Sequence, residues 1–278
     1  MRWGVKQRLE FIEFRLFWEG SINRKDLINT FGVSVPQAST DIKAYKKQAP
    51  GNIYYDKSLK QYLITSKFNP VFGSVNAHDY LSKLSTVADD MQKHDQNMMG
   101  FIPDFSVVPS IDRAIDPIVL RKLVKALKNK KAIKIKYQSM NRQSAVCRWI
   151  TPHAFAFDGF RWHVRAYCEL VEEFRDFILG RIISTQSIKK RRVNPNEDFK
   201  WNHFVKIKLA AHTNLSTGQK KIIEKEYDMV DGVAKIKVRA AFIYYVLLRF
   251  RLENPDNKLF LENKNVVLLN YNDLKEFI

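Results

Sequence analysis

Cysteine is scarce in this sequence, and no long apolar run is present. The two cysteines, Cys147 and Cys168, form no Cys-x-x-Cys pair, so we expect no disulfide framework, which fits a reducing cytoplasm. The longest apolar run, Ala240 to Leu248, is far shorter than the roughly 20 residues that span a bilayer. The first residues lack the apolar core of a signal peptide. We therefore expect a cytoplasmic protein with no membrane partner.

Signatures of enzymes are also missing. The sequence holds no Gly-rich phosphate loop, no His-Glu-x-x-His and no Gly-x-Ser-x-Gly. The acid pairs Asp89-Asp90 and Glu172-Glu173 have no histidine at a motif spacing, and the six histidines are scattered. We therefore predict no catalytic residue, no metal site and no cofactor.

What the sequence has in excess is positive charge. Lys and Arg number 47 against 29 for Asp and Glu, which gives a net charge of +18 and a pI near 9.8. A surface this basic attracts polyanions through its long-range field and through counterion release. Nucleic acid is therefore the first candidate partner and an anionic membrane the second. The run Lys189 to Arg192 is a weaker signal, typical of a solvated turn or a phosphate contact.

The first stretch, to about Thr65, predicts three helices followed by a hairpin. Asn23 is a suitable N-cap for the second helix, and Gly32 is a helix-stop signal. Ser34 opens the third helix, and Pro36 stands in its first turn, where a missing N–H costs nothing. Two strands follow, at 53–55 and 61–64. The order helix, turn, helix and hairpin indicates a winged helix-turn-helix, whose later helix enters the major groove of DNA.

Polar and basic residues gather on the third helix and in the hairpin loop. The helix N-terminus suits phosphate or base contacts, and lysines further along suit the DNA backbone. Each residue alone is also typical of an ordinary solvated helix face, so the prediction depends on the whole set of residues. It depends as well on the positive charge of the segment, since residues 1–67 hold 12 basic and 6 acidic residues. The predicted DNA-binding residues are Ser34, Gln37, Ser39, Thr40, Lys43, Lys46, Lys47, Lys57 and Lys60.

The rest of the chain predicts a linker and two further domains, so the overall class is α+β. Residues 68–116 form the linker, with a helical stretch from about Ala77 to His94. Residues 117–195 give a basic helix and five short strands, including a hairpin at Asp158-Gly159, which suggests a small barrel or half-barrel. Two of these predicted strands, Ala145–Thr151 and His153–Phe157, lie on either side of Pro152. Residues 200–278 alternate strand, helix, strand, helix, strand and predict an α+β extension.

A second concentration of positive charge lies in residues 117–200, which hold 19 basic and 7 acidic residues. Arginine within a small barrel is costly to bury unless it meets an anion, and its planar fork grips phosphate groups well. A set of surface arginines with an ordinary histidine remains the alternative. The candidate anion-binding residues are Arg165, Arg175, Arg181, His153, Tyr137 and Ser139.

Four stretches of the sequence resemble the WYL domain: Arg148 to His153, Asp158 to Tyr167, Phe174 to Phe177 and Gly180 to Ile182. The tripeptide that names that family reads Trp162-His163-Val164 here, which is a departure. The resemblance implies an Sm-like β-barrel and a ligand pocket for a nucleic acid or a nucleotide. It implies that this pocket is built from Tyr137, Ser139, His153, Arg165, Arg175 and Arg181, with His163 less certain.

The N-terminal segment from Val33 to Ile42, with Tyr45, looks like the winged helix of the BrxR and CapW repressors, which control bacterial phage-defence islands of the BREX and CBASS types. This second resemblance implies a homodimer on a pseudo-palindromic double-stranded DNA operator, dimerised through the C-terminal extension. The expected function is repression that ends when an anionic ligand binds the WYL domain. A WYL-type activator, or an accessory subunit of a nucleic-acid-processing enzyme, stays open, as do the operator, the ligand and the operon.

Overall fold

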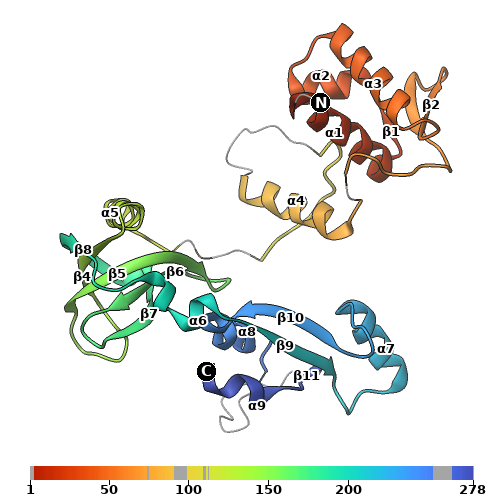
Figure 1. Cartoon of the computed structure of the whole chain (residues 1–278). Helices are drawn as coiled ribbons and strands as arrows, with labels where there is room; N and C mark the ends of the chain where they lie inside the picture. Colours follow the sequence, from red (N-terminus) through yellow and green to blue (C-terminus); the bar gives the residue numbers. More distant parts are fainter. Residues whose placement is uncertain are drawn as a thin grey trace. The chain divides into compact units, whose positions relative to one another are not determined.

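The computed structural model describes residues 3–73, 75–90, 99–108, 111, 113–252 and 265–277. The chain forms two compact units, Met1–Pro109 and Ser110–Ile278, and each is described by itself (Figure 1). Both units contain helices and strands, which confirms the predicted α+β class. Within the described residues, no helix is long and apolar enough to cross a membrane.

The N-terminal unit contains the three helices and the hairpin that the sequence predicts. A two-residue strand that the sequence does not reveal joins the hairpin, and the antiparallel order is β1-β3-β2. A further helix follows, and residues 91–94 of its predicted length lie outside the described residues. The elements are α1 (Trp3–Glu19), β1 (Ser21–Ile22), α2 (Arg24–Phe31), α3 (Val35–Gln48), β2 (Ile53–Asp56), β3 (Gln61–Ile64) and α4 (Ala77–Asp90).

Capping side chains fix where α2 and α3 begin and end. The Asn23 side chain accepts from the Asp26 N–H while Asp26 accepts from the Asn23 N–H, a reciprocal capping box. Gly32 ends α2 with a φ of 63°, which glycine adopts without the steric cost that a side chain brings. Ser34 then caps α3 by accepting from the Gln37 N–H. The local sequence therefore determines the turn between the two helices.

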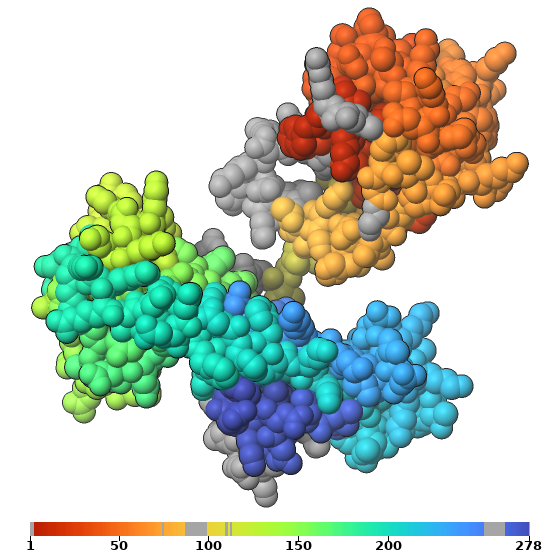
Figure 2. Space-filling view, in the orientation of Figure 1, coloured from red at the N-terminus to blue at the C-terminus, as the bar shows by residue number. Residues whose placement is uncertain are grey.

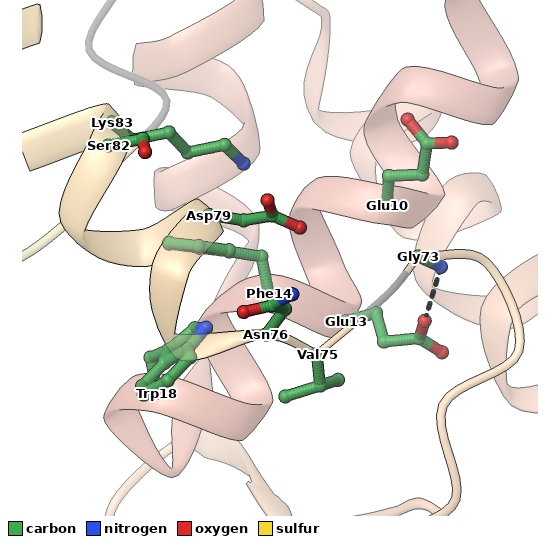
Figure 3. A pocket seen from close by; sticks show the side chains of 10 residues that line it. All are labelled: Glu10, Glu13, Phe14, Trp18, Gly73, Val75, Asn76, Asp79, Ser82 and Lys83. Atoms are coloured by element: carbon green, nitrogen blue, oxygen red, sulfur yellow. Dashed lines mark hydrogen bonds between the residues drawn. The ribbon is translucent and has the colours of Figure 1, made fainter. Parts of the chain in front are cut away.

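A buried carboxylate on α1 holds the segment that follows the hairpin. Glu13 is 1% exposed and accepts the backbone N–H groups of Val71, Phe72 and Gly73 at 2.7, 2.8 and 2.8 Å. The Tyr45 hydroxyl donates to it at 3.3 Å, and burial together with the charge of Glu13 raises the pKa of Tyr45. Figure 3 shows Glu13 bonded to Gly73 at the edge of a pocket of about 400 Å³ between α1 and α4.

The second unit begins with one helix and an antiparallel five-stranded sheet of order β7-β6-β5-β4-β8. The core between helix and sheet is apolar, with Leu123, Ile133, Ile150 and Val164 fully buried. The elements are α5 (Pro117–Lys128), β4 (Lys131–Tyr137), β5 (Val146–Phe157), β6 (Trp162–Cys168), β7 (Glu173–Ile178), the 3-10 turn η1 (Leu179–Arg181) and β8 (Ile182–Lys190).

Three details of this sheet differ from the sequence-based prediction. Within the described residues, β7 and β8 form no ladder, so the sheet is open rather than a closed barrel. The two strands predicted on either side of Pro152 are one strand, β5, with a register shift between Pro152 and Ala154 that accommodates the proline. Lys189 and Lys190 lie in β8 and not in a turn, and Lys189 pairs with Glu169 at 2.7 Å.

The last part of the chain has the predicted order of strands and helices around a sheet of order β10-β9-β11. Ile207, Leu209, Ile243 and Leu247 form its core. The elements are η2 (Pro195–Glu197), α6 (Phe199–Asn202), β9 (Phe204–Ala211), α7 (Thr217–Glu226), β10 (Ala234–Arg239), η3 (Ala240–Phe242), α8 (Ile243–Arg249), β11 (Val266–Leu268), α9 (Tyr271–Leu274) and η4 (Lys275–Phe277).

The Glu13 anchor makes a prediction about local stability. In the unchanged protein, the backbone N–H groups of residues 71–73 share the Glu13 carboxylate. Glu13→Gln places an amide NH2, itself a donor, against some of these donors, so we expect the N-terminal unit to lose about 2 kcal/mol of unfolding free energy. Hydrogen exchange of the amides at 71–73 should accelerate markedly. The control is Glu10→Gln on the same helix, whose ion pair with Lys6 at 3.5 Å is exposed, and its cost should stay below about 0.5 kcal/mol. Equal exchange rates in the two variants would contradict the anchor.

Candidate nucleic-acid interface and ligand site

One face of α3 packs in the core and the opposite face is open to solvent. Ala38, Ile42 and Tyr45 are at most 1% exposed, whereas Thr40 and Lys43 on the other side are exposed. Apolar residues at a helical period on one face and polar residues on the other are what a helix needs to pack and still reach a groove. The structure thus leaves α3 free to contact DNA through the predicted side.

The polar side chains near the start of α3 are held in place by local hydrogen bonds. The Ser39 and Thr40 hydroxyls donate to the carbonyls of Val35 and Pro36 at 3.0 and 2.9 Å. Their oxygen lone pairs stay available, and donation to a phosphate would require the hydroxyls to turn away from the helix.

A chain of contacts behind α3 was missed by the sequence analysis. The Gln37 amide donates to Asp41 at 2.9 Å, and Arg8 of α1 donates to the same carboxylate at 2.7 Å. Asp41 is 2% exposed, and Arg8 neutralises its charge. Arg8 also fixes the position of the Asp41 carboxylate, to which the Gln37 amide is bonded. Arg8 and Asp41 are 33 residues apart, and no local pattern connects them.

The predicted lysines are all exposed, on the last turns of α3 and in the turn between β2 and β3. Asp56 orders that turn by accepting the N–H groups of Ser58 and Leu59 at 2.8 and 2.9 Å. Among the described residues, none of these lysines has an ion-pair partner, so their charge is available to a polyanion. Two neighbouring aromatic residues that the sequence analysis did not single out, Tyr54 and Tyr55, are 47% and 45% exposed on β2. The lysines are Lys43, Lys46, Lys47, Lys57 and Lys60.

Two of the predicted ligand-binding residues meet, but on a carboxylate of the protein itself. Arg165 is 5% exposed, and its Nε and Nη2 donate to the two oxygens of Asp198 at 2.8 and 2.9 Å. His153 Nε2 lies 2.9 Å from Asp198 Oδ2. The second Nη of Arg165 is 3.4 Å from Asp176, which also accepts from the Tyr245 hydroxyl of α8 at 3.1 Å. The pair therefore joins the first sheet to the C-terminal elements.

The Asp198 carboxylate is strongly stabilised in its charged form. Burial alone would raise its pKa, but the hydrogen bonds from His153 and Arg165 outweigh burial and lower the pKa to about 2. Burial opposes the charge of Arg165 as well, yet Asp198 and Asp176 raise its pKa above the ordinary value. Arg165 thus already has its anion.

His163 has a similar internal partner. It is 3% exposed, and its Nε2 lies 2.9 Å from Asp158 Oδ2 at the Asp158-Gly159 turn. Asp158 also accepts the N–H groups of Phe160 and Arg161 at 2.7 and 2.6 Å. Although burial opposes it, these bonds lower the pKa of Asp158. His163 therefore shapes the turn from inside.

The other predicted ligand residues are dispersed. Arg175 is exposed on β7 and pairs with Glu173 at 2.8 Å. Ser139 accepts from the Asn141 N–H at 3.2 Å, and the Tyr137 hydroxyl accepts from the Ile178 N–H at 3.4 Å. Arg181 ends η1. The structure brings His153 and Arg165 together and does not gather the seven residues into one open pocket.

Beside Tyr137 lies a buried arginine that the sequence analysis left unassigned. Arg148 is 8% exposed, and its guanidinium carbon lies 5.5 Å from the Tyr137 ring centre and 5.8 Å from that of Phe177. Among the described residues, its Nε and Nη2 have no hydrogen-bond partner. Cation–π contacts are thus its main compensation.

A separate pocket of about 230 Å³ gathers three guanidinium groups. Arg113, Arg161 and Arg181 line it together with Trp162, and none of its lining residues is acidic. Arg161 is nevertheless paired with Asp158, outside the lining, at 3.3 Å. The close approach of η1 to residue 114 depends on Gly180, because a Cβ there would stand 3.0 Å from the Ala114 carbonyl oxygen. Of the three arginines, the sequence analysis named only Arg181 as a ligand residue. Arg113 lies outside the motif that carries the WYL resemblance.

Family models match most of the chain. Residues 4–86 match the BrxR transcriptional regulator winged helix-turn-helix domain, residues 118–187 match the WYL domain, and residues 204–274 match the BrxR transcriptional regulator C-terminal dimerization domain. These matches confirm the predicted resemblance.

Curated relatives match almost from end to end. A DNA-binding transcriptional repressor CapW of Escherichia coli (strain KTE188) is 37% identical over 98% of this chain and 91% of its own length. The CapW repressors of Stenotrophomonas maltophilia and Pseudomonas aeruginosa are 34% and 35% identical, each over 100% of this chain and 93% of their own lengths. Among solved structures, proteasome accessory factor B/C of Arthrobacter aurescens matches at 13% identity and a TM-score of 0.27, over 98% of this chain and 47% of that one, a likeness too weak to support an argument.

The Asp198 pair makes a prediction about acid stability. Because the folded pKa of Asp198, about 2, lies below its ordinary value of 3.8, its stabilisation is complete above about pH 4 and is lost as the pH falls toward 2. Asp198→Asn should cost about 3 kcal/mol at neutral pH, since Arg165 keeps only Asp176, and should flatten the fall in stability between about pH 4 and pH 2. Chemical unfolding at neutral pH and across that acid range measures both quantities.

The matched control for Asp198 is Glu173→Gln, which breaks the exposed pair with Arg175. Its cost should remain below about 0.5 kcal/mol at every pH, because screened surface pairs contribute little. An unchanged pH dependence in Asp198→Asn would show that this carboxylate is not the acid-sensitive link.

Proposed function

The chain belongs to the family of the CapW and BrxR transcriptional regulators, and we propose that it is a DNA-binding transcriptional repressor that acts as a homodimer. The full-length similarity to repressors named CapW favours repression over activation. The observation that carries the DNA-binding part is α3 itself, packed on one side and open on the other, with unpaired lysines along its last turns and in the wing turn among the described residues.

In this proposal the start of α3 reads bases and the lysines hold the backbone. The N–H groups at the start of a helix favour phosphate, and amide and hydroxyl side chains there reach base edges. Gln37 is the sharpest candidate for a base contact, because Asp41 and Arg8 restrict its amide to one side. A side chain held before binding loses less rotamer entropy on contact.

Two copies of α3 would read the half-sites of a pseudo-palindromic operator. The C-terminal segment matches a domain described as a dimerization domain in BrxR regulators, which supports residues 200–278 as the dimerising part. We assign residues 1–67 to the winged helix, 68–116 to a linker and 117–195 to the sensing domain, in a protein of the cytoplasm. A BREX or CBASS phage-defence operon is the proposed target.

The proposed signal is an anionic ligand, a nucleic acid or a nucleotide, at the WYL domain. Its first contacts are Arg113, Arg161 and Arg181, because that pocket has arginine forks and no acidic side chain in its lining. Arg165, His153 and His163 would act behind the pocket, since carboxylates of the protein hold them and their side chains are at most 6% exposed. Arg161 is also paired, with Asp158 at 3.3 Å, but 31% of its side chain is exposed. A ligand that favours the released dimer by a few kcal/mol suffices to empty the operator.

The DNA-binding part is tested on the promoter of the chain's own gene. Lys43→Gln with Lys47→Gln should lower the salt slope of binding by up to about 2 units, because each phosphate contact contributes about 0.9. Gln37→Ala should instead reduce the preference for the promoter over scrambled DNA, by about 1–3 kcal/mol. The control, Lys122→Gln with Lys125→Gln on α5, should change neither quantity. Equal affinity of the unchanged protein for promoter and scrambled DNA would refute specific repression.

The ligand part is tested by release of a labelled operator duplex. A short single-stranded DNA oligonucleotide, and separately a nucleoside triphosphate, is titrated against the complex. We expect one of the two probes to release the operator. Arg113→Gln with Arg181→Gln should keep operator affinity and need at least about tenfold more probe, which corresponds to 1.4 kcal/mol of lost contacts.

The matched control for the ligand test is Arg175→Gln, which should respond like the unchanged protein. The opposite pattern, with only Arg175→Gln impaired, would place the ligand on β7 and refute the pocket. Equal release in all variants would mean that the probe merely competes with the operator for the winged helix. Failure of both probes would refute a nucleic-acid or nucleotide signal.

A further inference from the structure

The outer face of the C-terminal sheet carries a ladder of positive charge that no part of the proposed function uses. The strands β9 and β10 pair antiparallel, with Lys206 opposite Lys237 and Lys208 opposite Lys235. Arg239 stands opposite Phe204 in the same register. We call these five basic residues, Lys206, Lys208, Lys235, Lys237 and Arg239, the basic ladder.

The register of the two strands is set by the core and not by the lysines. Ile207 and Leu209 are fully buried and Ala234 is 7% exposed, all on the inner face. Because side chains alternate along a strand, every outward position from 235 to 239 is then basic. The fold therefore forces the lysines to face one another across the ladder.

This arrangement costs stability in the free protein. Like charges directly opposite each other in an antiparallel pair are destabilising, and no residue of the basic ladder has an acidic partner among the described residues. Surface lysines are normally paired or dispersed in small domains. A feature that weakens the fold in isolation indicates a partner that relieves the repulsion.

Aromatic rings order the Phe204 end of the basic ladder. Phe204 is 45% exposed, with the Lys237 nitrogen 5.0 Å and the Arg239 guanidinium carbon 4.6 Å from its ring centre. Arg239 also lies 4.7 Å from the Trp201 ring and donates to the Trp201 carbonyl. These contacts restrict long side chains that would otherwise be mobile, so less entropy is lost when they bind an anion.

We propose that the basic ladder binds the phosphodiester backbone of nucleic acid, without reading its sequence. Outward residues recur about every 6.8 Å along each strand, given a strand rise of about 3.4 Å per residue. Two neighbouring rows of regularly spaced cations suit a polymer that carries one charge per nucleotide. The basic ladder shares no residue with α3 or with the arginine pocket. Its nucleic acid is either duplex DNA or a single strand.

The test compares two triple variants of the full-length protein that remove equal charge from the same domain. Lys206→Gln, Lys235→Gln and Lys237→Gln alter the basic ladder, and Lys220→Gln, Lys221→Gln and Lys225→Gln alter α7. Affinity for a duplex without operator sequence and for a single strand is measured over a range of NaCl concentrations. The ladder variant should lose up to about 2.7 units of salt slope on a duplex, or about 2 on a single strand, and the α7 variant less than 1.

The probe on which the salt slope falls identifies the source of the backbone. The ladder variant should also unfold at a temperature no lower than the unchanged protein, because it removes like-charge contacts, which excludes misfolding as the cause. Equal slopes in the two triple variants on both probes would overturn the proposal. A change of oligomeric mass in the ladder variant alone would also overturn it, because that result would assign the face to a second copy of the chain. Loss of binding to phosphatidylserine vesicles, without loss of binding to either nucleic acid, would overturn it too and would assign the face to a membrane.

Operator specificity provides an independent readout. The ratio of promoter to scrambled-DNA affinity depends on α3, so the ladder variant should keep it within about twofold, while its absolute affinities fall together. A chain that shows no operator preference at all could still show the expected difference between the two triple variants. The two proposals therefore fail separately.

Discussion

The buried pair of Asp198 with Arg165 is the contact on which the second unit depends. Neither charge can be left alone in the interior, because removing one partner leaves the other desolvated and unpaired. Arg165 comes from β6, which lies between β7 and β5 in the first sheet, and Asp198 lies at the start of α6, where it also accepts the Trp201 N–H. The sheet and the C-terminal elements are thus tied by charge rather than by apolar packing alone. Any signal that moves one against the other has to preserve this pair or offer Arg165 a different anion.

The N-terminal unit uses the same device for a different purpose. Glu13 is buried on α1 and collects backbone N–H groups from residues 71–73, just after the hairpin. In both units, then, a buried carboxylate fixes the segment that follows a β-sheet: residues 71–73 after β3, and the start of α6 after β8. The chemistry differs, since Glu13 accepts from neutral donors whereas Asp198 is paired with the Arg165 cation. Of these two carboxylates, only Asp198 has a cationic partner for which an anionic ligand would compete.

Local sequence predicted what local contacts determine. The caps Asn23 and Ser34, the stop at Gly32 and the apolar period of α3 placed the helix-turn-helix, because each acts within four residues. The Asp158-Gly159 turn was predicted for the same reason. The pairing of Arg165 with Asp198 spans 33 residues, and Arg113 reaches its pocket only because η1 folds against it. Sequence therefore predicted that arginines bind an anion without showing that Arg165 is already neutralised by Asp198. It also could not show whether β7 and β8 close a barrel, since closure depends on the summed twist of five strands.

Arginine and lysine have different roles in this protein, and the net charge does not show the difference. Arginine makes the buried forks, on Asp41 and on Asp198, where two parallel hydrogen bonds repay desolvation. Lysine supplies the exposed charge of α3, of the wing and of most of the basic ladder. Residues 201–278 hold 13 basic and 9 acidic residues, a balance of only +4 that gives no sign of the basic ladder. The informative signal is the alternation Lys235-Ile236-Lys237-Val238-Arg239, because a period of two turns a modest excess into a single-sign face. A surface that binds a polyanion is therefore better identified from the alternation of basic residues along a strand, and from their lack of acidic partners, than from the net charge of a domain.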